Sequence, residues 1–464
     1  LVLQFLFKFT DNYPGRENMS IEKIISILNT ILWDYMLIFL LIGVGLYYTF
    51  RLRFVQVRKF GYAMKKVFGD IFKKEAKADN DGMSSYQALA TAIAAQVGTG
   101  NLAGVATAIA SGGPGAIFWM WVSAFFGMGT IFAEATLAQV YVDRVDGEVT
   151  GGPAYYIKNG LHNNFLAVFF SVALIIALGF VGNMVQSNSI AASMKNAFGV
   201  SNLLIGVIVA ILAYLIFSGG MTRIASFTEL IVPIMALLYI VGCLTIVIIY
   251  RSNVGKAFKM IFQGAFTPSA VVGGIAGISV KKVMRYGVAR GLFSNEAGMG
   301  STPHAHAVAK VSHPAEQGFV AIVGVIIDTL VICTLTALVI LVTGSFTSGE
   351  TGALLTQIAF TNAFGKYGNP FIAISLLFFA FSTIVGWYFF GEANIKFLFG
   401  KGGIKYYRIL VLIFLVIGSV LDVKLVWDMA DTFNALMVLP NIIALFALSP
   451  VVVNSLRDYE KINR

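Results

Sequence analysis

The sequence predicts an all-α, polytopic membrane protein. Of its 464 residues, 58% are hydrophobic and only 12% are charged, and the mean hydropathy is +0.81. A water-soluble domain carries about twice that share of charged side chains. Apolar runs also recur along the whole chain, and a helix needs about 20 such residues to cross the hydrocarbon core of a bilayer. These observations exclude a water-soluble fold.

Eleven apolar segments are long enough to be membrane-spanning helices, given a rise of about 1.5 Å per residue. They cover residues 24–50, 84–110, 114–142, 165–197, 202–217, 224–250, 281–310, 318–343, 370–392, 406–421 and 425–453. The seventh has the weakest pattern, because Lys281, Lys282, Arg285 and Arg290 lie in its first part and the segment is rich in glycine. We expect a single integral membrane domain.

The chain divides at its loops into four parts. We expect residues 1–18, which precede Met19, to be an N-terminal extension. Residues 19–82 hold a peripheral transmembrane helix and a basic loop. The ten remaining helices form two sets of five, which we assign to residues 83–250 and, together with the C-terminal tail, to residues 251–464.

Positive charge indicates the orientation of the chain in the cell membrane. The loop Arg51–Asp81 alone holds nine Lys and Arg residues. Placing it in the cytoplasm puts 20 of the 33 Lys and Arg residues inside, 9 outside and 4 within the seventh span, as the positive-inside rule requires. The N-terminus is then outside and the C-terminus inside. The net charge of +10 is explained by cytoplasmic loops and anionic lipid, not by nucleic acid.

The first helix of each predicted set of five is interrupted by glycine and polar residues. The second span reads AAQVGTGNLAG over residues 94–104, and the seventh reads RGLFSNEAGMGS over residues 290–301. Because five is odd, the second set begins on the opposite side of the membrane, which predicts inverted repeats. Interrupted helices at matching positions of such repeats indicate a central binding site.

An interrupted helix offers two kinds of ligand at membrane depth. Gly98 and Gly100 let the backbone leave helical geometry, and its polar groups then need partners. The half-helix that begins near Asn101 presents N–H groups that suit a carboxylate, whereas the carbonyls before the break suit a cation. The pattern favours an amino acid bound beside Na⁺. The alternative is a helix-packing face, since Gly104 follows Gly100 at four-residue spacing.

Four blocks of the sequence, residues 83–109, 112–122, 151–157 and 290–301, resemble the alanine or glycine:cation symporter family of the amino acid-polyamine-organocation superfamily. The resemblance runs from about Met19 to the C-terminus. It implies a LeuT-type fold, in which a five-plus-five inverted repeat contains two discontinuous helices and one peripheral N-terminal helix is added. It also implies Na⁺ as the coupling ion, with no organic cofactor and no obligate protein partner.

The same resemblance places seven residues around the transported amino acid, and they are Thr99, Gly100, Asn101, Gln186, Phe293, Asn295 and Trp387. Residues 99–101 would hold the carboxylate, and Gln186 would form a further hydrogen bond. Asn295 would lie near the amino group. Phe293 and Trp387 would enclose the side chain and leave room for a methyl group only, which implies alanine or glycine as substrate.

For the sodium ion, the resemblance implies five oxygen ligands. The carbonyls of Ala94, Val97 and Phe379 would join the hydroxyls of Ser382 and Thr383. Oxygen ligands suit a hard cation. The alternative is that the two hydroxyls bond only to carbonyls of their own helix.

Three acidic residues at membrane depth, Glu134, Glu296 and Asp328, are expected to face the protein interior. Glu134 could accept hydrogen bonds from a broken backbone, and Glu296 could cap the second half-helix. The role of Asp328 stays open. The histidines His304, His306 and His313 are close enough in sequence to be considered as a metal site, although no cysteine or carboxylate cluster accompanies them.

Together, these features predict a secondary active transporter that brings alanine or glycine into the cell with Na⁺ by alternating access. A proton-coupled symporter, in which an acid such as Glu134 titrates, is an alternative. A channel or receptor on the same helices is another. An intramembrane enzyme that uses the histidines with Glu296 is a third.

Overall fold

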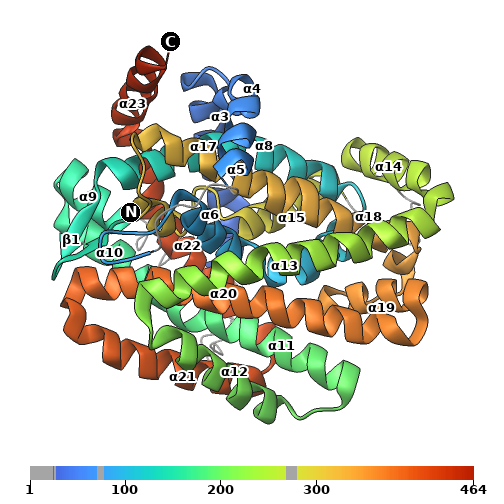
Figure 1. The fold of residues 1–464 in the computed structure, drawn as a ribbon. Helices are drawn as coiled ribbons and strands as arrows, with labels where there is room; N and C mark the ends of the chain where they lie inside the picture. Colours follow the sequence, from blue (N-terminus) through green and yellow to red (C-terminus); the bar gives the residue numbers. More distant parts are fainter. Residues whose placement is uncertain (1–24, 26–27, 71–77, 268–278, 464) are drawn as a thin grey trace, which may run out of the picture.

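The protein is almost entirely helical in a computed structural model that describes residues 25, 28–70, 78–267 and 279–463. The predicted extension, residues 1–18, lies outside the described residues. Long helices run beside one another (Figure 1). Eight helices in the described ranges are long and apolar enough to cross a membrane, and a bent helix pair makes a ninth. The chain is therefore an all-α, multi-pass membrane protein, as predicted.

Helices occur in each of the eleven expected segments, although the fifth and the seventh segments are not among the eight or nine that are long and apolar enough to cross a membrane. Several of these helices consist of successive pieces. In some a π-helical stretch interrupts the α-helix, and in others the helix itself is broken while the chain continues. They are η1 (Thr30–Leu37) with α3 (Ile38–Arg51), α6 (Ser85–Gln96) with η2 (Gly100–Gly104) and α7 (Val105–Gly112), α8 (Ala116–Val140), α10 (Asn164–Leu174) with η3 (Ile175–Gly182) and α11 (Asn183–Phe198), α12 (Asn202–Phe217), α13 (Gly220–Ile249), α15 (Val280–Asn295) with α16 (Pro303–Ala307), α17 (Pro314–Val325) with η4 (Ile326–Cys333) and α18 (Thr334–Val342), α20 (Gly368–Phe399), α21 (Ile404–Val420) and α22 (Val423–Ala447).

Shorter elements occupy the loops between these helices. They are α4 (Val55–Arg58), α5 (Phe60–Asp70), α9 (Pro153–Leu161), α14 (Arg251–Phe266), α19 (Gly352–Phe364), α23 (Ser449–Ile462), the 3₁₀ turns η5 (Ser345–Thr347), η6 (Gly365–Tyr367) and η7 (Lys401–Gly403), and the strands β1 (Asp143–Val145) and β2 (Glu148–Thr150). In Figure 1, β1 and α9 lie at one end of the long helices, and α14 and α19 lie at the opposite end.

The antiparallel hairpin of β1 and β2 was not expected from the sequence. Its strands pair Asp143 with Thr150, and its two-residue turn is Asp146-Gly147, with φ angles of +51° and +82°. Asp-Gly at positive φ is the preferred sequence of a type I′ hairpin turn. A search for apolar runs does not detect so short and polar an element.

Close contact between α15 and α8 depends on small residues. A Cβ atom added to Gly287 of α15 would lie 2.2 Å from the carbonyl oxygen of Ala116, and one added to Gly291 would lie 2.5 Å from the hydroxyl of Ser123. Glycine therefore lets the two backbones approach, as small residues do in membrane helix pairs. This packing fixes the helix that leads to the second interruption.

We expect Gly287→Ala to destabilise the protein, because the added methyl group would force α15 away from Ala116. Overpacking of this kind costs about 1–3 kcal/mol, more than the ~1 kcal/mol that alanine gains over glycine in a helix. The matched control is Gly43→Ala in α3, where the new Cβ meets nothing within 4 Å. Thermal unfolding in detergent should show a lower midpoint for Gly287→Ala only. Equal midpoints would contradict the packing assignment.

Candidate functional site

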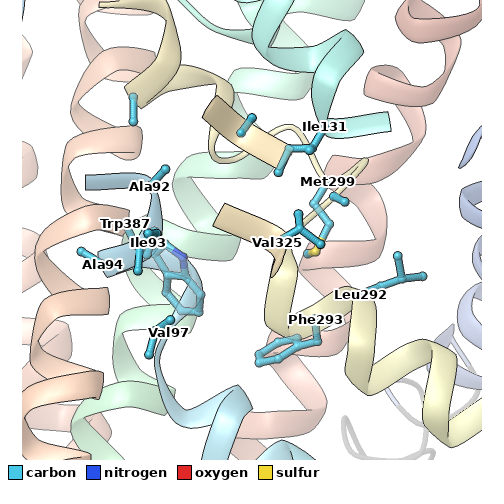
Figure 2. Packing of buried hydrophobic residues seen from close by; sticks show 14 of the residues in the cluster. Ala92, Ile93, Ala94, Val97, Ile131, Leu292, Phe293, Met299, Val325 and Trp387 are labelled. Carbon is cyan, nitrogen blue, oxygen red and sulfur yellow. The ribbon is translucent and has the colours of Figure 1, made fainter. Parts of the chain in front are cut away.

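The first helix interruption lies between α6 and η2. Val97 leaves the helix with φ −83° and ψ 90°, and the helical pieces on either side are bent by 49°. Figure 2 shows Val97 at the end of the first piece. Side chains satisfy the freed backbone, since Gly98 N donates to Asn101 Oδ1 at 2.9 Å and Thr99 N donates to Gln186 Oε1 at 3.3 Å. The predicted break in the second span is thus present.

The second interruption follows α15. Glu296, Gly298 and Gly300 have φ angles of +59°, +87° and +82°, so the chain turns several times before α16 begins. Glu134 of α8 accepts hydrogen bonds from Gly298 N at 2.8 Å and Gly300 N at 2.9 Å. The expected role of Glu134 in satisfying a broken backbone is therefore confirmed.

Glu296 has a different role from the one expected. Its carboxylate accepts hydrogen bonds from the Ser301 hydroxyl and, at 2.6 Å, from the indole N–H of Trp387. The interpretation that Glu296 caps the second half-helix is wrong. Its left-handed conformation ends α15, and the carboxylate is bound to α20 and to a side-chain hydroxyl instead of backbone N–H groups.

Buried polar side chains hold the two interruptions together. Asp328 of η4 accepts hydrogen bonds from the Asn101 amide at 2.6 Å and from the Ser294 hydroxyl at 3.0 Å. Gln96 adds a bond of 2.7 Å to the carbonyl of Asn295. Because Asn101 belongs to the first interruption and Ser294 precedes the second, Asp328 fixes the distance between them.

All five expected cation ligands lie together. The Thr383 hydroxyl is 3.0 Å from the carbonyl oxygen of Ala94, 3.4 Å from that of Val97 and 3.0 Å from that of Phe379. The Ser382 hydroxyl is 3.4 Å from Ala94 O and 2.8 Å from Phe379 O. The contacts to Phe379 lie within α20, and they are the hydrogen bonds expected if the two hydroxyls bond only to carbonyls of their own helix. The contacts to Ala94 and Val97 join α20 to the first interruption.

This set of oxygens has the donor chemistry that hard cations prefer. Each of the three carbonyl oxygens lies within 3.4 Å of one or both hydroxyls, and the Ser382 hydroxyl also lies 3.3 Å from the thioether sulfur of Met235. Glycine allows α20 to lie this close to the first interruption. A Cβ on Gly386 would lie 3.0 Å from Ala95 N, and one on Gly98 would lie 2.3 Å from the Thr383 hydroxyl.

The seven residues expected around the amino acid are all buried at the two interruptions. Thr99 Oγ1 has no hydrogen-bond partner among the described residues, although buried polar atoms usually have one. The amides of Asn101 and Asn295 are engaged within the protein, the latter with the Thr329 hydroxyl at 3.2 Å. Gly100 approaches Phe293, since a Cβ there would lie 3.5 Å from the ring.

A cavity of about 540 Å³ opens beside the first interruption, and Arg290, Trp427 and Asp431 are among its lining residues. Arg290 pairs with Asp431 at 3.3 Å and lies 5.9 Å from the centre of the Phe293 ring. The Phe293 ring lies 5.5 Å from that of Trp427. Phe293 therefore lies next to Arg290, which lines the cavity, and next to Gly100 of the first interruption. Trp427 and Asp431 were not among the residues expected from the sequence, because no local motif marks them.

Comparison with known proteins agrees with this geometry. Residues 18–464 match the model of the sodium:alanine symporter family. The chain belongs to this family. It is therefore a sodium-coupled amino acid symporter and not an enzyme.

The names of several relatives state a substrate, and two of these relatives serve as examples. The sodium/alanine symporter AgcS of Methanococcus maripaludis is 41% identical, over 96% of this chain and 99% of its own length. The probable sodium/glutamine symporter GlnT of Bacillus subtilis is 43% identical, over 95% and 91%.

Solved structures share the fold at low sequence identity. The transporter MhsT, crystallised with L-phenylalanine, has a TM-score of 0.59 at 14% identity and covers 81% of this chain and 90% of its own. A manganese transporter of Eremococcus coleocola has a TM-score of 0.51 at 14% identity, over 79% and 77%. The fold is therefore similar to that of LeuT-type transporters.

Polar contacts join the two broken helices at the end opposite the cavity. Met83 N donates to Val308 O and Lys310 N donates to Met83 O, both at 2.9 Å. The Lys310 ammonium also bonds Asp79 at 2.7 Å, which lowers the pKa of that carboxyl. Gln139 of α8 donates to three carbonyls at the end of α16, among them that of Ala309. At the end away from the cavity, the two broken helices are thus held as one unit.

The histidines have structural roles in this family member. His304 Nδ1 bonds the carbonyl of Ser301 at 2.6 Å, His306 Nδ1 bonds Gln317 at 2.8 Å, and His313 accepts a hydrogen bond at the start of α17. In the part of the chain that the structure describes, no group of three His, Cys, Asp or Glu side chains is placed to hold a metal ion. The hypothesis that these histidines form a metal site or an enzyme centre has no support in the described residues.

We expect Trp387→Phe to lower Na⁺-driven uptake about tenfold, because the aromatic ring stays while a buried oxygen of Glu296 loses its hydrogen-bond partner, which costs about 1–3 kcal/mol. Initial uptake rates in proteoliposomes measure the effect. Glu296→Gln is the matched variant, since its amide oxygen still accepts from the indole, and it should retain more activity. Wild-type uptake by Trp387→Phe would show that this bond does not matter.

Proposed function

We propose that this symporter carries alanine or glycine into the cell together with Na⁺ by alternating access. The observation that supports it most is that the cation ligands and the residues expected at the substrate carboxylate share one interruption. Ala94 and Val97 provide carbonyls immediately before it, and Thr99 and Gly100 follow directly. A cation and a carboxylate would therefore bind within a few residues of each other.

The orientation of the helix pieces suits a zwitterion. The piece from Gly100 to Gly112 begins at the interruption, and the positive end of its dipole would favour a carboxylate there. The unpartnered Thr99 hydroxyl would donate to the same group. Phe293 and Trp387 limit the space beside Gly100 and Gly182, where a Cβ on Gly182 would lie 2.6 Å from the Trp387 ring. An amino acid with a small side chain therefore fits the remaining space best.

Binding of the two ligands would be mutually favourable. A cation that joins α20 to Ala94 and Val97 would fix the interruption in the geometry that receives the carboxylate, and by linkage the amino acid would raise the affinity for the cation by the same factor. One charge entering with the ion gains about 2.3 kcal/mol per 100 mV of membrane potential, which corresponds to roughly fifty-fold accumulation.

We also propose eleven spans with the five-plus-five inverted repeat, divided near residues 83 and 251, and an N-terminus outside. The two interruptions occupy the first helix of each proposed repeat, in α6–α7 and α15–α16. The cavity at Arg290 and Asp431 then faces outward, and the contacts of Met83 with residues 308–310 close the inner side.

The deciding experiment is uptake of radiolabelled alanine, glycine and glutamine into proteoliposomes with Na⁺ on one side only. We expect Na⁺-driven accumulation of alanine and glycine above the external concentration, stimulated by an inside-negative potential. A channel would equilibrate substrate without concentrating it. Accumulation driven by an imposed pH gradient without Na⁺ would favour proton coupling, and a preference for glutamine would overturn the proposed substrate.

The cation site is tested separately by Thr383→Val, which keeps the shape of the side chain and removes the hydroxyl. We expect the Na⁺ concentration for half-maximal uptake to rise roughly tenfold, or ~1.4 kcal/mol, with little change at saturating Na⁺. Ser375→Ala is the control on the same helix, because the Ser375 hydroxyl is also buried but has no partner among the described residues. An equal shift in both variants would place the cation elsewhere.

A further inference from the structure

The chain turns sharply where α3 ends. Arg53 and Phe54 both have a φ angle of +54°, a conformation that is unfavourable for residues other than glycine. Phe54 N donates to the carbonyl of Thr49 at 2.7 Å, which closes the turn. The segment that follows, α4 and α5, therefore stays at the end of the first predicted span. We call residues 50–69 the basic arm.

The basic arm carries a net positive charge. It contains six basic residues, and one acid, Asp70, follows it directly at the end of α5. The six are Arg51, Arg53, Arg58, Lys59, Lys65 and Lys66. Two of them are paired, Arg58 with Glu460 of α23 and Lys66 with Glu316 of α17. The other four have no ion pair within the described ranges, and Arg51, Arg53 and Lys65 are exposed.

Large apolar side chains are interleaved with these charges. Phe50 is 64% exposed and Val57 is 59% exposed, and three further phenylalanines of the arm are exposed as well, namely Phe54, Phe60 and Phe68. Exposed aromatic rings beside Lys and Arg are characteristic of segments that lie in the headgroup region of a bilayer, with the rings directed to the acyl chains and the cations to the phosphates.

The opposite face of the arm is fixed to the transport core. Ala63 and Val67 of α5 are buried, and the Tyr62 ring lies 5.1 Å from that of Phe319 in α17. The ion pair of Lys66 with Glu316 adds a contact of 3.1 Å. The cations and rings are thus presented on a surface that is held in place, at the end of a predicted membrane-spanning helix.

We propose that the basic arm is a binding site for anionic phospholipid headgroups. Arg51, Arg53, Lys59 and Lys65 bind the phosphates, and the exposed phenylalanines enter the acyl region beside them. Charge complementarity selects an anionic lipid over a zwitterionic one, and the rings select a lipid over a soluble anion. Because α5 rests on α17, which continues into the helix bearing Asp328, the bound lipid supports the helix that joins the two interruptions.

The test is lipid retention by the purified, delipidated full chain in detergent, titrated with phosphatidylglycerol or phosphatidylcholine and followed by native mass spectrometry. The triple variant R51Q/R53Q/K65Q removes three exposed charges from the arm. Because each cation near a lipid surface contributes to the attraction of an anionic headgroup, its affinity for phosphatidylglycerol should fall at least tenfold. Phosphatidylcholine should bind weakly to both proteins.

The matched control is R51K/R53K, which changes two of the same side chains and keeps their charge. It should bind phosphatidylglycerol as the unaltered protein does. A loss of affinity in R51K/R53K equal to that of the triple variant, or equal retention in all proteins, would overturn the proposal. So would displacement of the lipid by an excess of inorganic phosphate. None of these readouts depends on transport.

Discussion

The structure depends on the cost of leaving backbone polar groups unpaired at membrane depth. Such groups cost several kcal/mol each in hydrocarbon, yet two helices of this protein are interrupted there. Each interruption is permitted because side chains replace the missing helical partners. Asn101 and Gln186 accept from the first, and Glu134 accepts from the second. Polar groups at these positions that still have free hydrogen-bonding capacity are the groups that can bind the ligands.

Buried acids serve this structure chiefly as hydrogen-bond acceptors. Glu134 receives two backbone N–H groups and the amide of Asn441, and Asp328 receives an amide and two hydroxyls from three different helical segments. Acids inside membranes are usually read first as ion or proton sites. The geometry here shows a positioning role directly, since each carboxylate ties an interruption to a helix that is continuous.

The sequence predicted the interruptions but not all their partners. Glycine and amide residues cluster at residues 98–101 and 295–300, and unwinding is a local property that such clusters reveal. The bond of Trp387 to Glu296 joins residues 91 positions apart, and the pair of Arg290 and Asp431 joins residues 141 apart. No local pattern encodes contacts of that kind. The family resemblance supplied the convergence of α20 on the first interruption, which periodicity alone could not.

One helix connects the candidate cation site to both interruptions. On α20, Ser382 and Thr383 face the carbonyls of Ala94 and Val97, and Trp387, about one turn further on, holds Glu296. A cation bound at the proposed site would draw α20 toward the first interruption and would act on the second through the same helix, because residues four apart lie on one face of a helix. Coupling between the ion and the amino acid would then need no long-range pathway. It would require only that one helix, α20, contacts both interruptions.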